Sequence, residues 1–175
     1  MQVILTGAPG TGKSALIAEL ATRGWDVREE VSRQVIAGEG LTPWDHPATW
    51  ALACAERMGR NRAAATTLRS TLFDRAEMDL WAYLRHAQIE VTVESALMGY
   101  AADALIAPLW PDIFQQEPSR PQSWADAVAL DARLREVYAE AGFTLHEVPL
   151  GSVPERADWV EEWLEARGAL RKDAA

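Results

Sequence analysis

The segment GAPGTGKS, near the start of the chain, constrains the fold more than any other stretch of sequence. It matches the pattern G-x-x-x-x-G-K-[ST] at Gly7, Gly12, Lys13 and Ser14. The residues before it, QVILT, are apolar and β-branched like a buried strand, and the following ALIAELATRG is helical in character. A glycine-rich turn between a strand and a helix holds phosphate with its backbone N–H groups and with the positive end of the helix. The segment therefore predicts a nucleotide-binding P-loop.

Each part of this loop has an expected task in binding ATP and Mg²⁺. The Lys13 amine would reach the β- and γ-phosphates, and the Ser14 hydroxyl would bind Mg²⁺. The residues expected to contact ATP from this loop are Ala8, Pro9, Gly10, Thr11, Gly12, Lys13 and Ser14.

Strand-like and helix-like segments alternate along the rest of the chain. The expected strands are residues 2–6, 25–30, 71–75, 103–111 and 143–150. Helices fill the intervals, and two of them begin with capping boxes, at Ser123 with Asp126 and at Ser152 with Glu155. This alternation predicts an α/β fold, a P-loop NTPase with a parallel five-stranded sheet and helices on both faces. The 175 residues suit a single domain, residues 1–175.

Composition limits the kinds of partner that the chain can have. It has 26 acidic against 17 basic residues, and the net charge of −9 argues against a nucleic acid or an acidic membrane surface. The single cysteine, Cys54, excludes an internal disulfide, and we expect it to be a small buried apolar residue. The chain lacks both an apolar run of about 18 residues and the basic-then-apolar start of a secretory signal. We expect a cytoplasmic protein, and a homo-oligomer is compatible with these features.

Acidic residues at strand ends are candidates to complete the magnesium site. Asp74 is the best placed, because it ends the strand TLFD. Glu94 and Asp103 are the alternatives, although Asp103 begins its strand and ligands gather at the carboxyl ends. Arg75 could hold a phosphate or the acceptor, or it could form an ordinary surface ion pair with its neighbour. The three histidines lack metal-ligand spacing, so Mg²⁺ is the only metal expected.

Several classes of P-loop protein are excluded by missing motifs. The chain carries neither the N-K-x-D motif of guanine-specific switches nor the L-S-G-G-Q signature of transporter ATPases. It is also too short for the extra helical domain of a ring-forming ATPase. A compact nucleoside or nucleotide kinase, or a small stand-alone ATPase of the same plan, remains.

Further motifs carry a resemblance that covers nearly the whole chain. They are ILTGAPGTGKSALIAELATRG, EEVSRQVI, PW at positions 43–44, LFDRAEMDLWAYL, LIAPLWPDIFQQEPSR and LHEVPLGSVPERADWV. With these motifs the chain resembles the small bacterial AAA-domain ATPases, which are related to the kinase domain that phosphorylates nicotinamide riboside and, more distantly, to deoxynucleoside kinases. The resemblance implies a nucleoside or nucleotide kinase-like architecture and the use of ATP.

The resemblance also implies roles for residues on the acceptor side. Glu30 would face the acceptor and take its hydroxyl proton, and Arg33 would hold the acceptor or a phosphate. Asp74 and Arg75 would join the metal and acceptor sites, and Asp79 would shape the pocket.

The same resemblance implies a lid and an adenine border. Arg120 would close on the transferring phosphoryl group from a lid at about residues 112–123, and residues 151–156, with Ser152, would border the adenine. Two departures from the family pattern affect the lid and the choice of acceptor. Glu117 stands where relatives commonly have Asp, and Ala76 stands where glycine is more usual.

The segment of about residues 38–70 is expected to be a helical insert that builds the acceptor pocket. Trp44 and Trp50 lie in it, and each could line a ligand or simply pack in the interior. We therefore expect an ATP-dependent kinase that phosphorylates a small-molecule hydroxyl. The alternative is a stand-alone regulatory ATPase, an ATP-dependent switch that acts on a protein partner.

Overall fold

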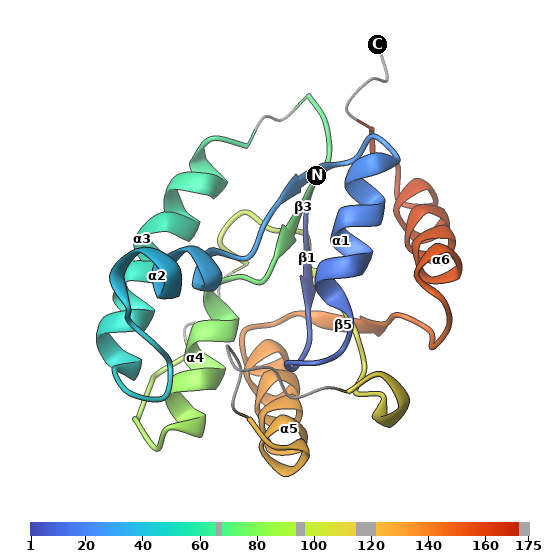
Figure 1. Cartoon of the computed structure of the whole chain (residues 1–175). Coiled ribbons are helices and arrows are strands. Elements are labelled where there is room, and N and C mark those ends of the chain that lie inside the picture. The colour runs from blue at the N-terminus through green and yellow to red at the C-terminus, as the bar shows by residue number, and fades with distance from the viewer. Residues whose placement is uncertain (66–67, 94–96, 115–121, 172–175) are drawn as a thin grey trace.

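The computed structural model describes residues 1–65, 68–93, 97–114 and 122–171. These residues form a five-stranded parallel sheet in the order β2-β3-β1-β4-β5 (Figure 1). The strands are β1 (Gln2–Thr6), β2 (Asp26–Arg28), β3 (Thr71–Asp74), β4 (Asp103–Ile106) and β5 (Thr144–Glu147). The helices are α1 (Lys13–Thr22), α2 (Val31–Glu39), α3 (Pro47–Ala63), α4 (Glu77–His86), α5 (Trp124–Glu140) and α6 (Val153–Glu165), with a short 3-10 helix η1 (Pro111–Ile113). The predicted α/β class with a parallel sheet is confirmed.

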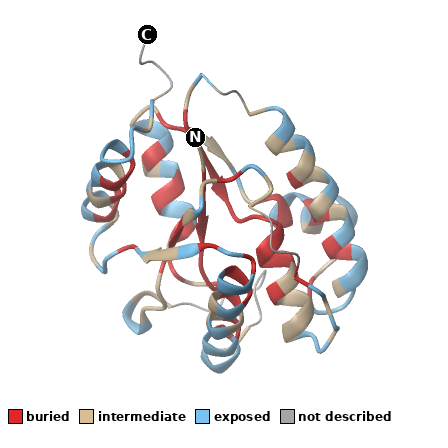
Figure 2. Cartoon of the chain, turned by 180° about the vertical axis from the view of Figure 1, so that it is seen from behind, coloured by how far each residue is buried: buried red, intermediate tan, exposed pale blue. Residues whose placement is uncertain are grey.

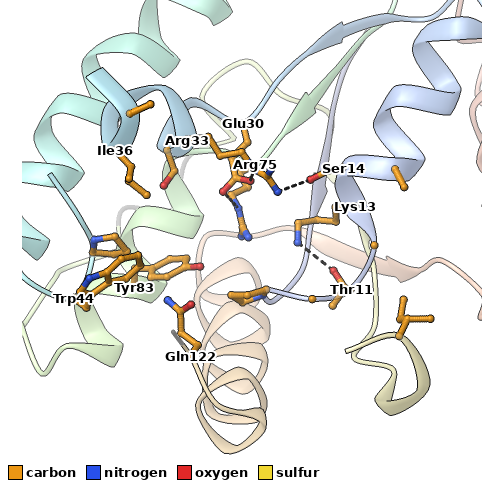
Figure 3. A pocket seen from close by; sticks show the side chains of 18 residues that line it. Thr11, Lys13, Ser14, Glu30, Arg33, Ile36, Trp44, Arg75, Tyr83 and Gln122 are labelled. Carbon is orange, nitrogen blue, oxygen red and sulfur yellow. Dashed lines mark hydrogen bonds and ion pairs between the residues drawn. The ribbon is translucent and has the colours of Figure 1, made fainter. Parts of the chain in front are cut away.

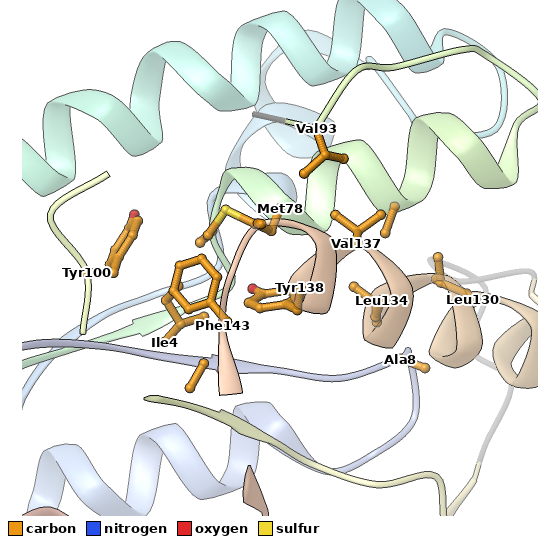
Figure 4. Close-up of a cluster of buried hydrophobic side chains, with 14 of the residues drawn as sticks. Ile4, Ala8, Met78, Val93, Tyr100, Leu130, Leu134, Val137, Tyr138 and Phe143 are labelled. Atoms are coloured by element: carbon orange, nitrogen blue, oxygen red, sulfur yellow. The ribbon is translucent and has the colours of Figure 1, made fainter. Parts of the chain in front are cut away.

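Helices cover both faces of the sheet. Successive side chains of a strand point to opposite faces, and in β1 the side chains on both faces are apolar. On one face, Val3 and Leu5 of β1 pack against α1 and α6. On the other face, Ile4 packs against residues of α4 and α5 that include Met78 and Tyr138 (Figure 4). The central strands β1, β3 and β4 are therefore buried from both sides, and the exposed residues lie mainly on the outer faces of the helices (Figure 2).

A third apolar cluster joins α2, α3 and α4 beside the main sheet. Val35, Trp50 and Cys54 lie at its centre, and Leu80 of α4 packs against them. Burial raises the pKa of the Cys54 thiol to about 12, so this residue is the inert apolar side chain that its sequence context suggested. This cluster fixes α2 and α4, which carry residues of the site.

The predicted capping boxes are confirmed, whereas several strand ends differ from prediction. The hydroxyls of Ser123 and Ser152 each accept a hydrogen bond at the start of α5 and α6. The strand β2 ends at Arg28 rather than at residue 30, because the chain already turns into α2, with Glu30 at its N-cap. The strand β4 likewise ends at Ile106, ahead of a proline-rich segment that cannot continue the ladder.

The strand register brings the functional ends of the central strands together. Leu5 of β1 pairs with Asp74 of β3, and Thr6 pairs with Ile106 of β4. The loops that follow β1, β3 and β4 therefore leave the same edge of the sheet, which is where ligands bind in open parallel sheets. Within the described residues, no helix is both long enough and apolar enough to cross a membrane.

Candidate active site

The P-loop follows β1 and depends on its glycines for geometric reasons. Gly7 has φ 142°, and a Cβ there would lie 2.5 Å from the carbonyl oxygen of Ala107. Gly10 has φ 81°, and a Cβ there would lie 2.6 Å from the ring of Phe114. Both positions combine a left-handed backbone with a close neighbour, so only glycine fits.

The amine of Lys13 is folded into this loop and contacts only neutral oxygen atoms. It donates hydrogen bonds to the carbonyls of Gly7 and Ala8, at 2.7 and 2.8 Å, and to the hydroxyl of Thr11 at 3.1 Å. Burial and the nearby Arg75 cation lower the pKa of Lys13 to about 7. An incoming phosphate would offset both effects, because it supplies the negative charge that these neutral partners lack.

Arg75 stands directly after β3 and links three parts of the site. Its backbone has φ 73°, an uncommon value for a residue with a side chain. Its buried guanidinium donates to the carboxylates of Glu30 (3.0 Å) and Asp79 (2.9 Å), and to the carbonyl of Gly7 (3.0 Å). The start of α2, the P-loop and α4 are thus held together by one cation.

Asp79, which the sequence suggested would shape the pocket, does not line it and acts instead on Arg75, which does. Its carboxylate accepts hydrogen bonds from Arg75, from Thr6 Oγ1 (2.7 Å), from the N–H of Ala76 (3.0 Å) and from the hydroxyl of Tyr138 (2.6 Å). The residue is 1% exposed and does not line the cavity described below. The physical reason is that every lone-pair direction of the carboxylate is already used.

Glu30 and Arg33 connect the start of α2 to the P-loop. Arg33 donates to Glu30 at 3.1 Å and to the Ser14 hydroxyl at 2.9 Å. Burial favours the neutral form of Glu30, but Arg75, Lys13 and Arg33 outweigh it and lower the pKa of this carboxyl to about 2. Its neighbour in sequence, Glu29, is exposed to solvent. Glu30 is therefore the member of this pair that faces the site.

Asp74 has a feature of a metal ligand, namely a buried carboxylate oxygen that no hydrogen bond from the described residues occupies. It is buried at the carboxyl end of β3, and its Oδ1 has no hydrogen-bond partner among the described residues. Burial and the neighbouring carboxylate of Glu30 raise the pKa of Asp74 to about 6. A buried carboxylate oxygen without a partner fits Mg²⁺, which is usually held by one or two carboxylates and by substrate phosphates. The Ser14 hydroxyl, the other expected ligand, lines the cavity described below, whereas Asp74 lies behind that lining.

Of the two alternative carboxylates, Asp103 does not compete with Asp74 on geometry. Asp103 begins β4, at the opposite edge of the sheet, and its carboxylate lies 2.6 Å from a ring nitrogen of His146. Glu94 lies outside the described residues.

A single cavity of about 480 Å³ runs from the P-loop to the acceptor-side residues (Figure 3). Figure 3 shows Trp44, Tyr83 and Gln122 across the cavity from Lys13 and Thr11. The lining residues that the sequence had singled out are Pro9, Gly10, Thr11, Gly12, Lys13, Ser14, Glu30, Arg33, Trp44 and Arg75. A volume of this size suits a small-molecule ligand.

Other predicted site residues lie away from the cavity. The side chain of Ala8 belongs to the hydrophobic core, so only its backbone takes part in the loop. The Ser152 hydroxyl serves the capping box of α6, donating to Glu155 at 2.6 Å, and does not line the cavity. Trp50 packs against Tyr83 and is fully buried, which decides for packing at that position. Arg120 and most of the expected lid lie outside the described residues.

Tyr83 is the main lining residue that sequence reasoning missed. It stands on α4, four residues after Asp79, so the two share one face of the helix. Its ring lies 5.8 Å from the guanidinium of Arg75. The i, i+4 spacing from an expected pocket residue was the signal that could have found it.

Comparisons with known proteins agree on the architecture. A family model described as an AAA domain matches residues 2–156. No curated protein is detectably similar in sequence.

Solved kinase structures share the fold at low sequence identity. Deoxyadenosine kinase from M. mycoides is 12% identical with a TM-score of 0.67, covering 95% of this chain and 100% of that one. Shikimate kinase from Aquifex aeolicus is 14% identical with a TM-score of 0.59, covering 96% and 98%. Thymidylate kinase from Candida albicans is 11% identical with a TM-score of 0.59, covering 95% and 92%.

Proposed function

Because the chain belongs to the AAA-domain family, whose model spans residues 2–156, we propose that it uses ATP to phosphorylate a hydroxyl group of a small molecule. The observation that carries this proposal is the single cavity that joins Lys13 and Ser14 of the P-loop to Glu30, Arg75 and Trp44. An ATPase that only switches between conformations has no need of a small-molecule cavity beside its P-loop. The cavity therefore favours the kinase over the regulatory ATPase.

The P-loop half of the cavity would hold the phosphates of ATP. The backbone N–H groups of residues 10–14 and the N-terminus of α1 supply donors, and Lys13 supplies charge at the outer phosphates. Mg²⁺ held by Ser14, Asp74 and phosphate oxygens would neutralise charge on the phosphate chain. Arg120, in the expected lid, stays a proposed further cation for the transferred group.

The other half of the cavity would present the acceptor hydroxyl in line with the γ-phosphate. The hydroxyl oxygen forms a bond to the γ-phosphorus while the bond from that phosphorus to the β,γ-bridging oxygen breaks, which releases ADP. The hydroxyl proton passes to Glu30. Phosphoryl transfer has a loose transition state, so most of the rate comes from alignment and charge neutralisation. With a pKa of about 2, Glu30 acts chiefly by orienting the hydroxyl and takes the proton late.

The walls of the cavity indicate the kind of acceptor. One wall is apolar and partly aromatic, made of Ile36, Ala37, Pro43, Trp44 and Tyr83. The polar groups gather at the end that carries Glu30, Arg33 and Arg75. We infer an acceptor with a flat apolar ring at one end and a hydroxyl at the other. The structural neighbours are named as kinases of small molecules, deoxyadenosine and shikimate among them, which supports this class.

The test is ATP turnover, measured with and without a set of nucleosides, hydroxyl-bearing vitamins and amino alcohols. The expected result is that one acceptor stimulates turnover and appears as its phosphate ester in the products. Turnover that no acceptor changes, but that a protein partner stimulates, would contradict the kinase and support the regulatory ATPase.

A matched pair of variants checks that the acceptor occupies the cavity. Trp44→Ala should raise the KM for the acceptor about tenfold or more, because it removes most of one aromatic wall, while leaving the KM for ATP unchanged. Leu52→Ala, at a residue of α3 that is 73% exposed and outside the cavity, should leave both constants unchanged.

A further inference from the structure

A second buried cation lies against the P-loop, from the side of α6. Arg156, in the first turn of α6, is 3% exposed and donates from Nη1 to the carbonyl oxygen of Thr11 at 3.1 Å. The same nitrogen would lie 2.9 Å from a Cβ placed on Gly12. A residue 145 positions away in sequence is thus in direct contact with the phosphate-binding turn.

The charge of Arg156 has no counterpart in the part of the chain that the structure describes. No described carboxylate forms an ion pair with it, and its Nε has no hydrogen-bond partner there. The adjacent acid, Glu155, is turned away into the capping box with Ser152. Burial lowers the pKa of Arg156, and no charged group offsets that effect. Arg75, the other buried arginine of the site, is paired with two carboxylates.

An unpaired buried cation destabilises the fold, because a charge removed from water loses its hydration unless a counter-charge replaces the water. The chain has 26 acidic residues, and none of those that the structure describes pairs with Arg156. Lys13 is the other buried cation whose hydrogen bonds go only to neutral oxygens, and those oxygens belong to the same loop. Two buried cations that donate only to neutral oxygens of one turn indicate that an anion from outside the protein supplies the counter-charge.

We propose that Arg156 is a positioning residue for the phosphate chain of the bound nucleotide, acting through the P-loop. In a trans peptide the C=O and N–H groups point in opposite directions. Holding the Thr11 carbonyl toward Arg156 therefore turns the N–H of Gly12 away from it, and both Thr11 and Gly12 line the cavity. The guanidinium also places a positive charge directly behind the turn. The proposal depends only on nucleotide binding and not on the identity of the acceptor.

The test measures the binding of three ligands by calorimetry: ATP, inorganic tripolyphosphate and adenosine. Arg156→Gln should weaken the binding of ATP and of tripolyphosphate by about tenfold to a hundredfold, the usual effect of losing a charge-assisted interaction. The binding of adenosine should not change. Arg156→Lys should recover part of the loss, because it restores the charge. The control is Arg167→Gln, which removes a cation that follows α6, also donates to a backbone carbonyl, and lies near Asp103.

Stability separates this role from a merely structural one. Because Arg156 is buried without a counter-charge, Arg156→Gln should leave the unfolding temperature of the nucleotide-free protein unchanged or higher. Three results would overturn the proposal: unchanged affinity for ATP, an equal loss for adenosine, or a lower unfolding temperature that Arg156→Lys does not restore. A protein that shows the expected binding but phosphorylates no acceptor would remove the proposed function and leave this inference standing.

Discussion

Arg75 Nε lies 3.0 Å from Glu30 Oε1, and this ion pair joins the residue that follows β3 to the N-cap of α2, 45 positions away in sequence. Both side chains are largely withdrawn from solvent, so water screens their attraction weakly. The pair keeps Glu30 charged at the mouth of the cavity and fixes Arg75 against the P-loop carbonyl of Gly7. One interaction thus serves both stability and the geometry of the site.

The ion pair predicts how stability depends on pH in acid. The pKa of Glu30 is about 2 in the folded protein and 4.5 when unperturbed, so the unfolded chain binds its proton first as the pH falls. Glu30 therefore contributes stability that is present above about pH 4.5 and is lost between about pH 4.5 and 2. The free energy of unfolding, measured by denaturant titration over this range, should fall less steeply with decreasing pH in Glu30→Gln than in the wild type. Glu29→Gln, at an exposed neighbour, should keep the wild-type slope, and equal slopes in all three proteins would contradict the assignment.

The features that could be predicted from sequence are those set by local patterns. The P-loop, the capping boxes at Ser123 and Ser152, and the alternation that builds the parallel sheet all depend on neighbours within a few residues. The end of β2 was misplaced, because the apolar pattern does not reveal where the chain turns into α2.

The contacts that could not be predicted join distant segments. The four hydrogen bonds that occupy Asp79 come partly from Thr6 and Tyr138, which lie on other elements. Arg156 meets Thr11 only because α6 packs beside α1, and nothing in the sequence around either residue indicates that contact. Such pairs are products of tertiary packing.

Lys13 should matter for the outer phosphates alone. Lys13→Ala should weaken the binding of ATP by about tenfold to a hundredfold, because it removes a charge-assisted contact to the β- and γ-phosphates. The binding of AMP, which lacks those phosphates, should change little. Calorimetric titration of both nucleotides checks this expectation. An equal loss for ATP and AMP would mean that the substitution disrupts the loop itself, since the amine also holds the carbonyls of Gly7 and Ala8.

The Asp74 carboxylate should lower the stability of the nucleotide-free protein and bind magnesium in the nucleotide complex. Burial raises the pKa of this carboxyl to about 6, so its charge destabilises the nucleotide-free protein. Asp74→Asn should therefore unfold at the same or a higher temperature while losing most of its Mg²⁺-dependent turnover. Asp103→Asn, at the opposite edge of the sheet, is the matched control and should keep wild-type turnover. Unaltered turnover with the same Mg²⁺ dependence in Asp74→Asn would assign the metal to another carboxylate, and Glu94 would be the next to test.

Substitution of Glu30 distinguishes the kinase hypothesis from the regulatory ATPase hypothesis most directly. Its carboxylate lines the cavity and is held by Arg75 and Arg33, whereas Glu29 faces solvent. A group that orients and deprotonates a reacting hydroxyl contributes about 10²–10⁴-fold to the rate, and a carboxyl with a pKa of about 2 belongs at the lower end of that range.

Glu30→Gln should therefore slow phosphorylation of the acceptor about a hundredfold, because the amide keeps the shape of the side chain but cannot take the proton. The affinity for ATP should stay within a factor of about three, since the hydrogen bonds of Glu30 reach the P-loop only indirectly, through Arg33 and Arg75. Phosphoryl transfer and basal ATP hydrolysis, measured side by side for Glu30→Gln and Glu29→Gln, give the comparison. If Glu30→Gln lowered both reactions equally, Glu30 would serve ATP hydrolysis in general, as in a switch. If it lowered neither reaction, the proposal of kinase activity would have to be abandoned, because no other carboxylate among the described residues lines this cavity.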